Sequence, residues 1–161
     1  MTISQKKLRR TAEHVYYEIS MFHFTTIYLE KMRNPPIYLV NALLESWCIH
    51  LRNLLDFFYT STANRYRDDV LAEDYISDLQ QFKQTRAKTR TFAHIKKRVA
   101  KQIAHLTYHR NVYNRKTKPW PYKQIYGQIY PTVTAFYDSL PKHKRRWLHF
   151  IELKKVIDAR Y

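Results

Sequence analysis

Apolar residues recur at helical spacing in two long segments at the start of the chain, residues 5–33 and 37–60. A spacing of three and four positions is typical of a helix that buries one face. The stripe of the first segment is Leu8, Ala12, Val15, Ile19, Phe22, Thr26 and Leu29, and that of the second is Val40, Leu43, Leu44, Trp47, Leu51, Leu54, Leu55 and Phe58. Because Asn34-Pro35-Pro36 interrupts helical backbone, the pattern predicts two long helices joined by a short turn.

The later part of the chain has a less regular pattern. The acidic stretch 68–78 is expected to form a short helix, and 80–90 an exposed connector. The elements expected after them are a third long helix over 91–115, a loop over 116–121, a helix over 122–140 that Pro131 kinks or splits, and a last helix over 142–159. These elements predict an all-α, up-and-down bundle of four to five helices in a single domain over residues 1–161.

The composition excludes several classes of protein. Gly127 is the only glycine, which argues against a hairpin-rich β fold and against glycine-rich phosphate loops. The lone Cys48 cannot form an internal disulfide, and no Cys/His spacing resembles a zinc site, so we expect neither a metal nor a cofactor. The N-terminus is polar and no apolar run is long enough to span a bilayer. We therefore expect a cytoplasmic protein without a membrane partner.

The charge of +16 is unevenly distributed along the chain. Residues 1–78 hold nine Lys and Arg against ten Asp and Glu, whereas residues 79–137 hold thirteen Lys and Arg and no acidic residue. Residues 138–161 hold seven basic and three acidic residues. Such a surface attracts phosphates, and nucleic acid is the commonest polyanion. The alternative is a domain that merely has a high pI.

The expected helix 91–115 separates its charged residues into two sets. Its buried stripe on a regular helical wheel is Ile95, Val99, Ile103, Leu106 and Tyr113. Arg98, Lys101, His105 and His109 share the flank beside that stripe, within about 80° of one another. Lys96 and Lys97 lie on the more solvated side. The flank residues are therefore the candidates for chemistry.

An arginine and a histidine two turns apart could act together on RNA. The planar guanidinium of Arg98 offers two parallel donors to a phosphate. His105 stands among cations that disfavour its protonated form, and a neutral imidazole can accept a proton from a 2′-hydroxyl. The alternative is that Arg98 and Lys101 are ordinary solvated charges and that His105 is a partly buried ring.

Other residues are expected to support this pair. On the helix 37–60, Glu45 or Arg52 would face the Arg98/His105 cleft, although Arg52 and Asp56 are four apart and can pair instead. His50 is expected to be a partly buried structural ring. The predicted supporting residues are Lys101, His109, Glu45 and Arg52, and the predicted RNA contacts are Lys96, Lys97, Arg110 and Trp120. Trp120 lies in a basic loop, where its ring could stack on a base.

Two segments resemble the HEPN family of helical domains. Arg98, six residues and then His105 in an IAHLT setting resemble the family's Arg-x4–6-His signature, and ALLESWCIHLRNLLDFFY (42–59) resembles the second helix of HEPN-like bundles from bacterial and phage-defence proteins. The resemblance implies an all-α bundle, often a homodimer with the Arg/His helices near the dimer cleft. Many members are metal-independent endoribonucleases; others are non-catalytic RNA-binding or interaction modules.

Carried over to this chain, the resemblance implies that Arg98 holds the scissile phosphate and that His105 acts on the 2′-hydroxyl or the leaving oxygen. Val99 stands where active members commonly have a polar residue. The sequence thus predicts an RNA-binding, metal-independent endoribonuclease of the defence or toxin–antitoxin kind. The alternative is a non-catalytic module that binds RNA or a protein partner, as a regulator or antitoxin-like protein. A DNA-binding helical protein is a third, less favoured reading.

Overall fold

The computed structural model describes residues 3–66, 68–88, 90, 92–104, 108–112 and 119–149, with only the backbone of Ala104 and His109. Every regular element in these ranges is helical, which confirms the all-α prediction. The α-helices are α1 (Gln5–Lys31), α2 (Ile37–Tyr59), α3 (Leu79–Thr85), α4 (Ala93–Val99), α5 (Tyr122–Asp138) and α6 (Lys142–Arg145). Shorter 3₁₀ turns and one π turn connect them. None of these helices is long and apolar enough to cross a bilayer.

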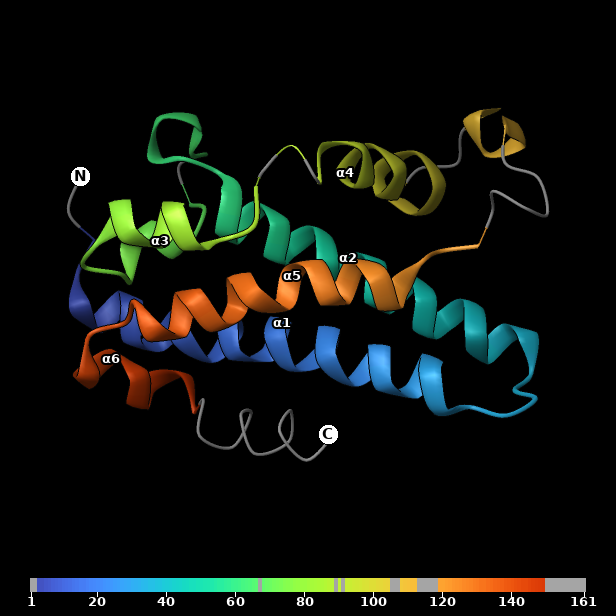
Figure 1. Cartoon of the computed structure of the whole chain (residues 1–161), viewed down its shortest axis with the longest axis horizontal. Helices are drawn as coiled ribbons and strands as arrows, with labels where there is room; N and C mark the ends of the chain where they lie inside the picture. Colours follow the sequence, from blue (N-terminus) through green and yellow to red (C-terminus); the bar gives the residue numbers. More distant parts are fainter. Residues whose placement is uncertain are drawn as a thin grey trace.

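The two N-terminal helices match the prediction closely and form an antiparallel pair (Figure 1). The Ser4 side chain accepts a hydrogen bond from the backbone N–H of Lys7 and caps α1, as serine commonly does at this position. Asn34 adopts a left-handed conformation, with φ of 49°, in the turn between the helices. Pro36 directly precedes the first residue of α2. The chain reverses where the sequence lacks helix-forming residues.

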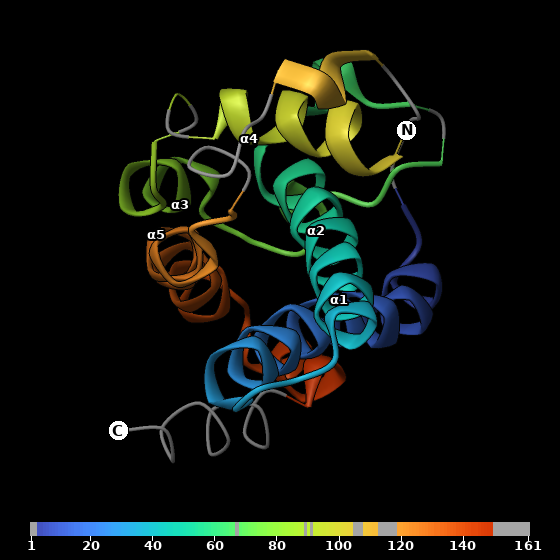
Figure 2. The same ribbon diagram turned by 90° about the vertical axis from the view of Figure 1, so that its right-hand side faces the viewer.

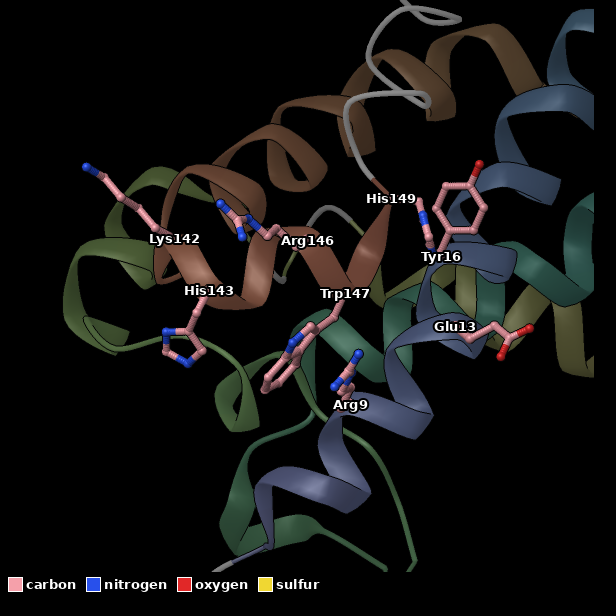
Figure 3. A pocket seen from close by; sticks show the side chains of 8 residues that line it. All are labelled: Arg9, Glu13, Tyr16, Lys142, His143, Arg146, Trp147 and His149. Carbon is pink, nitrogen blue, oxygen red and sulfur yellow. The ribbon is translucent and has the colours of Figure 1, made fainter.

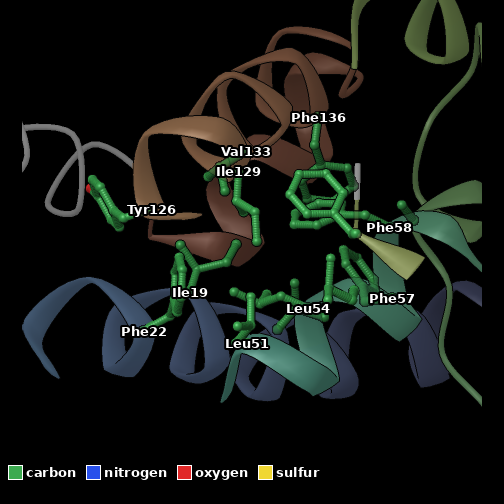
Figure 4. Packing of buried hydrophobic residues seen from close by; sticks show 14 of the residues in the cluster. Ile19, Phe22, Leu51, Leu54, Phe57, Phe58, Tyr126, Ile129, Val133 and Phe136 are labelled. Carbon is green, nitrogen blue, oxygen red and sulfur yellow. The ribbon is translucent and has the colours of Figure 1, made fainter. Parts of the chain in front are cut away.

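Helix α5 packs alongside the α1–α2 pair and closes the core (Figures 1 and 2). Figure 4 shows side chains from all three helices meeting between them. They include Ile19 and Phe22 from α1, Leu51, Leu54, Phe57 and Phe58 from α2, and Ile129, Val133 and Phe136 from α5, all buried. In Figure 1, α1, α2, α4 and α5 run in alternating directions, as in an up-and-down bundle.

Pro131 neither splits nor ends α5, which continues from Tyr122 to Asp138. A proline removes one backbone hydrogen bond and crowds the carbonyl four residues earlier. That carbonyl belongs to Gly127, the chain's one glycine. Buried residues on both sides of the proline, Ile129 and Val133 among them, fix the helix on the core. Tertiary packing here outweighs the local cost.

The segment between α2 and α4 differs from the prediction. The stretch 80–90, predicted to be an exposed connector, contains most of α3, and Phe82 is fully buried. Asp78 caps this helix by accepting a hydrogen bond from Gln81 N–H at 2.8 Å. The stretch 68–78 forms only a 3₁₀ turn at Ala72–Asp74, because Asp74 is held by Arg65 at 2.5 Å and caps the Leu71 N–H at 2.9 Å.

The prediction of a third long helix over 91–115 is wrong in its extent. Helix α4 ends at Val99, a π turn spans Ala100–Ala104, and a 3₁₀ turn spans Tyr108–Val112. A wheel of 100° per residue therefore applies only through Val99, since a π turn holds more residues than an α turn. Ile95 and Val99 are buried as predicted.

The C-terminal helix predicted over 142–159 is short where the structure describes it. Helix α6 covers four residues and passes into a 3₁₀ turn at Arg146–Leu148. His149 then takes a left-handed conformation, with φ of 44°, which ends regular helix. The rest of that prediction lies outside the described residues.

Candidate functional site

Arg98 lies in the last turn of α4 and is held by contacts with Gln102, Pro119 and Trp120. Its Nε donates a hydrogen bond to Oε1 of Gln102 at 2.8 Å, and its Nη2 donates to the Pro119 carbonyl at 3.2 Å. Its Cζ lies 4.1 Å from the centroid of the Trp120 ring, a cation–π contact that stabilises by about 0.5–2 kcal/mol. Arg98 as a whole is half-buried. Its orientation is therefore fixed by protein groups.

Trp120 is part of the core, which corrects the prediction that it is exposed for base stacking. Its exposed fraction is 7%, and it packs edge to face on Trp47 with centroids 6.1 Å apart. Trp47 is fully buried, and its indole N–H donates to Oγ1 of Thr26 at 2.9 Å. With Trp47 beside it and Arg98 over one face, Trp120 anchors the loop before α5.

Two hollows flank the Arg98–Trp120 stack. The larger, of about 290 Å³, is lined by Asn41, Leu44, Glu45, Gln102, Ile103, Arg110 and Trp120. The smaller, of about 120 Å³, is lined by His94, Ile95, Arg98, Trp120, Pro121, Gln124, Ile125 and Gln128. The structure thus brings Glu45 and Arg110, both singled out from the sequence, to one side of the stack. Arg110 there donates to the Ile103 carbonyl at 3.3 Å.

Two histidines, His105 and His109, are predicted for the site from the sequence. His105 lies outside the described residues, and so does the side chain of His109. His94 lies four residues before Arg98 on α4, is exposed, and shares the smaller hollow with it. The prediction from sequence did not include His94 and Gln102. Both are four positions from Arg98 on the expected helix 91–115, a spacing that places side chains next to each other.

Arg52 and Lys96 belong to a separate ion-pair cluster. Arg52 Nε lies 4.0 Å from Oδ2 of Asp56, and Lys96 binds Oδ1 of the same carboxylate. All three side chains are nearly half exposed and line a hollow of about 700 Å³ with Tyr59 and Thr60. The pairing of Arg52 with Asp56 is thereby confirmed, and Lys96 is ion-paired rather than simply solvated.

The remaining cations of the acid-free segment differ in their partners. Lys83 and Lys123 pair with Glu73 and Glu30, each at 3.0 Å. Lys88, Arg90 and Lys97 are exposed and form no ion pair with any described residue. Lys101 is exposed in the π turn. Carboxylates from the N-terminal half thus offset part of the positive charge but leave Lys88, Arg90 and Lys97 uncompensated.

Arg86 has a structural role at the start of this segment. Its guanidinium donates to the Phe58 carbonyl and lies over the rings of Tyr59 and Phe82, at 4.9 and 5.5 Å from their centroids. Burial lowers the pKa of Arg86, while the nearby Tyr59 and Glu73 oppose that shift. The residue ties the end of α3 to α2 and is not available to a phosphate.

Cys48 and His50 are both buried in the core region, and for His50 the sequence predicts such a position. Burial raises the pKa of the Cys48 thiol to about 12, with the Arg98 charge opposing and Glu45 reinforcing the shift. His50 is buried, and its Nδ1 lies 2.7 Å from Oε2 of Glu18. No group of three or more His, Cys, Asp or Glu in the described ranges is arranged to hold a metal ion.

Comparison of the chain with models of protein families, with curated proteins and with solved structures found no match. The HEPN resemblance thus depends on the two segments that carry it, ALLESWCIHLRNLLDFFY on α2 and the Arg98–His105 spacing.

Proposed function

We propose that this protein binds RNA through the α4 surface, which is formed by the α3–α4 connection and α4. The observation that carries the proposal is the acid-free segment 79–137, in which Lys88, Arg90 and Lys97 are exposed and lack ion pairs with the described residues. Uncompensated cations on one segment release counterions from a phosphate backbone when they bind it. In this proposal the protein is HEPN-like and, as that resemblance implies, a homodimer.

Binding of a fluorescently labelled single-stranded RNA 20-mer, measured by anisotropy, tests this function. The triple variant Lys88→Ala, Arg90→Ala, Lys97→Ala should weaken binding at least about tenfold, because it removes three cations that contact phosphates. The loss should be similar for every RNA sequence, since phosphate contacts do not read the bases. The matched control is Lys6→Ala, Lys31→Ala, Arg33→Ala, which removes the same charge from exposed positions on α1 and the turn after it. Equal weakening by both variants, or no binding by the unmodified protein, would contradict the proposal.

RNA cleavage by Arg98 and His105 is the second candidate function. The observation that favours it is the guanidinium of Arg98, which Gln102 and Pro119 hold in one orientation and which lines the smaller hollow. Such an arginine meets a phosphodiester without first having to be ordered. His105 would take the proton of the 2′-hydroxyl, whose oxygen attacks phosphorus. The 5′-oxygen of the next nucleotide would leave and take a proton from water, giving a 2′,3′-cyclic phosphate and a 5′-hydroxyl, and His105 would then release its own proton to solvent.

Incubation of a mixed RNA with the protein in excess chelator separates the binding module from the enzyme. The enzyme predicts cyclic-phosphate products that disappear in His105→Ala, while RNA binding persists. Arg98→Lys keeps the charge but not the planar fork, and should lower cleavage without loss of the circular-dichroism signal. His94→Gln is the control for the second histidine near Arg98. Binding without cleavage by the unmodified protein would leave the non-catalytic module.

A further inference from the structure

A basic hollow lies between the first half of α1 and the α6 region, on the side of the molecule away from α4 (Figure 3). Its volume is about 820 Å³, and it is lined by Arg9, Glu13, Tyr16, Lys142, His143, Arg146, Trp147 and His149. Helix α6 and α4 lie on opposite sides of the α1–α2 pair (Figures 1 and 2). This hollow is therefore distinct from the surface around Arg98.

The structure separates the four cations of Lys142, Lys144, Arg145 and Arg146 into two kinds. Lys144 is buried, and its Nζ donates to the carbonyls of Asp74 at 3.3 Å and Tyr75 at 3.0 Å. Arg145 donates to the carbonyls of Leu140 and Asp138, at 3.0 and 2.9 Å. These two residues attach α6 to the rest of the fold. Lys142 and Arg146, four residues apart, remain on the exposed face that borders the hollow.

Arg9 supplies a third cation from α1. Arg9, Lys142 and Arg146 are exposed, and none of them forms an ion pair with a described residue. Glu13 is the one acid among the lining residues. Figure 3 shows Arg9 and Trp147 pointing into the same space from opposite sides, with Lys142 extending from the rim. The hollow thus has a net positive charge and an aromatic wall.

Trp147 differs from the other two tryptophans of the chain. Trp47 and Trp120 are buried, with exposed fractions of 0% and 7%, whereas Trp147 is only partly buried and lines the hollow. The ring of His143 packs against Trp147 edge to face, with the two centroids 5.6 Å apart. Tyr16 and His149 also line the hollow and are in edge-to-face contact, with centroids 5.9 Å apart. Aromatic rings beside arginines are the combination that binds single-stranded nucleic acid, since bases stack on the rings and phosphates meet the cations.

We propose that this hollow binds a nucleotide of single-stranded RNA, with the base against Trp147 and the flanking phosphates on Arg9 and Arg146. The inference shares its ligand with the proposed function but depends on different residues. An acidic peptide would satisfy the cations as well, but it would leave the aromatic wall without a partner. RNA extending from this hollow to the α4 surface would contact the protein on two sides.

Quenching of tryptophan fluorescence by a uridine hexaribonucleotide tests this inference directly. The unmodified protein should show saturable quenching that is absent in Trp147→Phe, because Trp47 and Trp120 are buried. Arg9→Ala with Arg146→Ala should weaken hexamer binding about tenfold or more. The matched control is Arg10→Ala with Arg33→Ala, two exposed arginines that do not line the hollow, and it should change binding little.

Several results would overturn the inference while leaving the proposed function intact. They are 20-mer binding without hexamer quenching, equal effects of the two double variants, and quenching that persists in Trp147→Phe. Binding of a glutamate heptapeptide as tight as that of the hexamer would also overturn it, by showing a site for acidic peptide. The triple variant Lys88→Ala, Arg90→Ala, Lys97→Ala should leave hexamer quenching unchanged, so failure of the α4 surface is distinguishable from failure of this hollow.

Discussion

Several side chains that the sequence marks as functional candidates also make contacts that hold the fold together. Arg98 and Trp120 form a stack that packs on Trp47, and the Trp47 indole is in turn held by Thr26. The sequence places Trp120 in a basic loop, and nothing in its local pattern indicates that a tryptophan of another helix lies behind it. The role of Arg98 is similar, because its Pro119 partner is 21 residues away. Sequence spacing identified Arg98 but not its surroundings.

The buried hydrogen bond between Trp47 and Thr26 should be costly to remove. Thr26→Val keeps the shape of the side chain but leaves the Trp47 N–H without its acceptor at 2.9 Å. We expect a loss of about 1–3 kcal/mol in the free energy of unfolding, the cost of an unsatisfied buried donor, measured by urea denaturation. Thr134→Val is the control, because Thr134 is exposed and, among the described residues, bonds only to a backbone carbonyl of its own helix. Similar losses in both variants would show that the indole contact is unimportant.

The Cys48 thiol should be unreactive in the folded protein. Burial raises its pKa from 9.0 to about 12, and the thiolate is the form that reacts. Ellman's reagent at pH 8 should therefore detect no thiol in native protein and one thiol after unfolding in guanidinium. Rapid native labelling would contradict this placement.

The same shift makes stability depend on pH. The thiol of the unfolded chain loses its proton above pH 9, while the folded thiol keeps it. The stability that the folded state has at neutral pH is therefore unaffected by this group below pH 9 and decreases as pH rises toward 12. Between these values the unmodified protein should lose up to about 1.4 kcal/mol per pH unit more than Cys48→Ala. Parallel pH profiles of the two proteins would argue against the raised pKa.

Among the elements, those with strong periodicity were predictable and those fixed by distant contacts were not. Helices α1 and α2 follow their apolar stripes to within two residues. Helix α3 was missed because its single fully buried residue, Phe82, cannot establish a period. The break after Val99 was missed because the apolar spacing continues through Ile103 while the backbone changes to a π turn.

Arg86 should be as important to the α3 region as a core residue. Its guanidinium joins the Phe58 carbonyl and two aromatic rings, and lysine cannot reproduce that planar contact. We expect Arg86→Lys to lower the free energy of unfolding by about 1–3 kcal/mol, as for a lost hydrogen bond to a charged group. The exposed Arg90→Lys should stay within about 0.5 kcal/mol. Thermal or urea unfolding distinguishes the two, and equal effects would contradict the structural role of Arg86.

At the scale of the whole molecule, the charge distribution is the property that the sequence predicted most directly. The acid-free segment was evident from composition, but the structure was needed to show which cations remain available. Glu73, Asp56 and Glu30 neutralise three of them from elsewhere in the chain, and Arg86 is used internally. The hollow of Arg9, Arg146 and Trp147 could not be found from sequence, because its two walls are more than 120 residues apart.

The salt dependence of RNA binding tests the proposed function most directly. Affinity for the single-stranded 20-mer should fall linearly on logarithmic axes as salt rises, with a slope of about −0.7 for each phosphate contact. The triple variant Lys88→Ala, Arg90→Ala, Lys97→Ala should reduce the steepness by about 2, the equivalent of three lost contacts. The variant Lys6→Ala, Lys31→Ala, Arg33→Ala should keep the original slope. A slope that the two variants change equally, or an affinity independent of salt, would contradict RNA binding by the α4 surface.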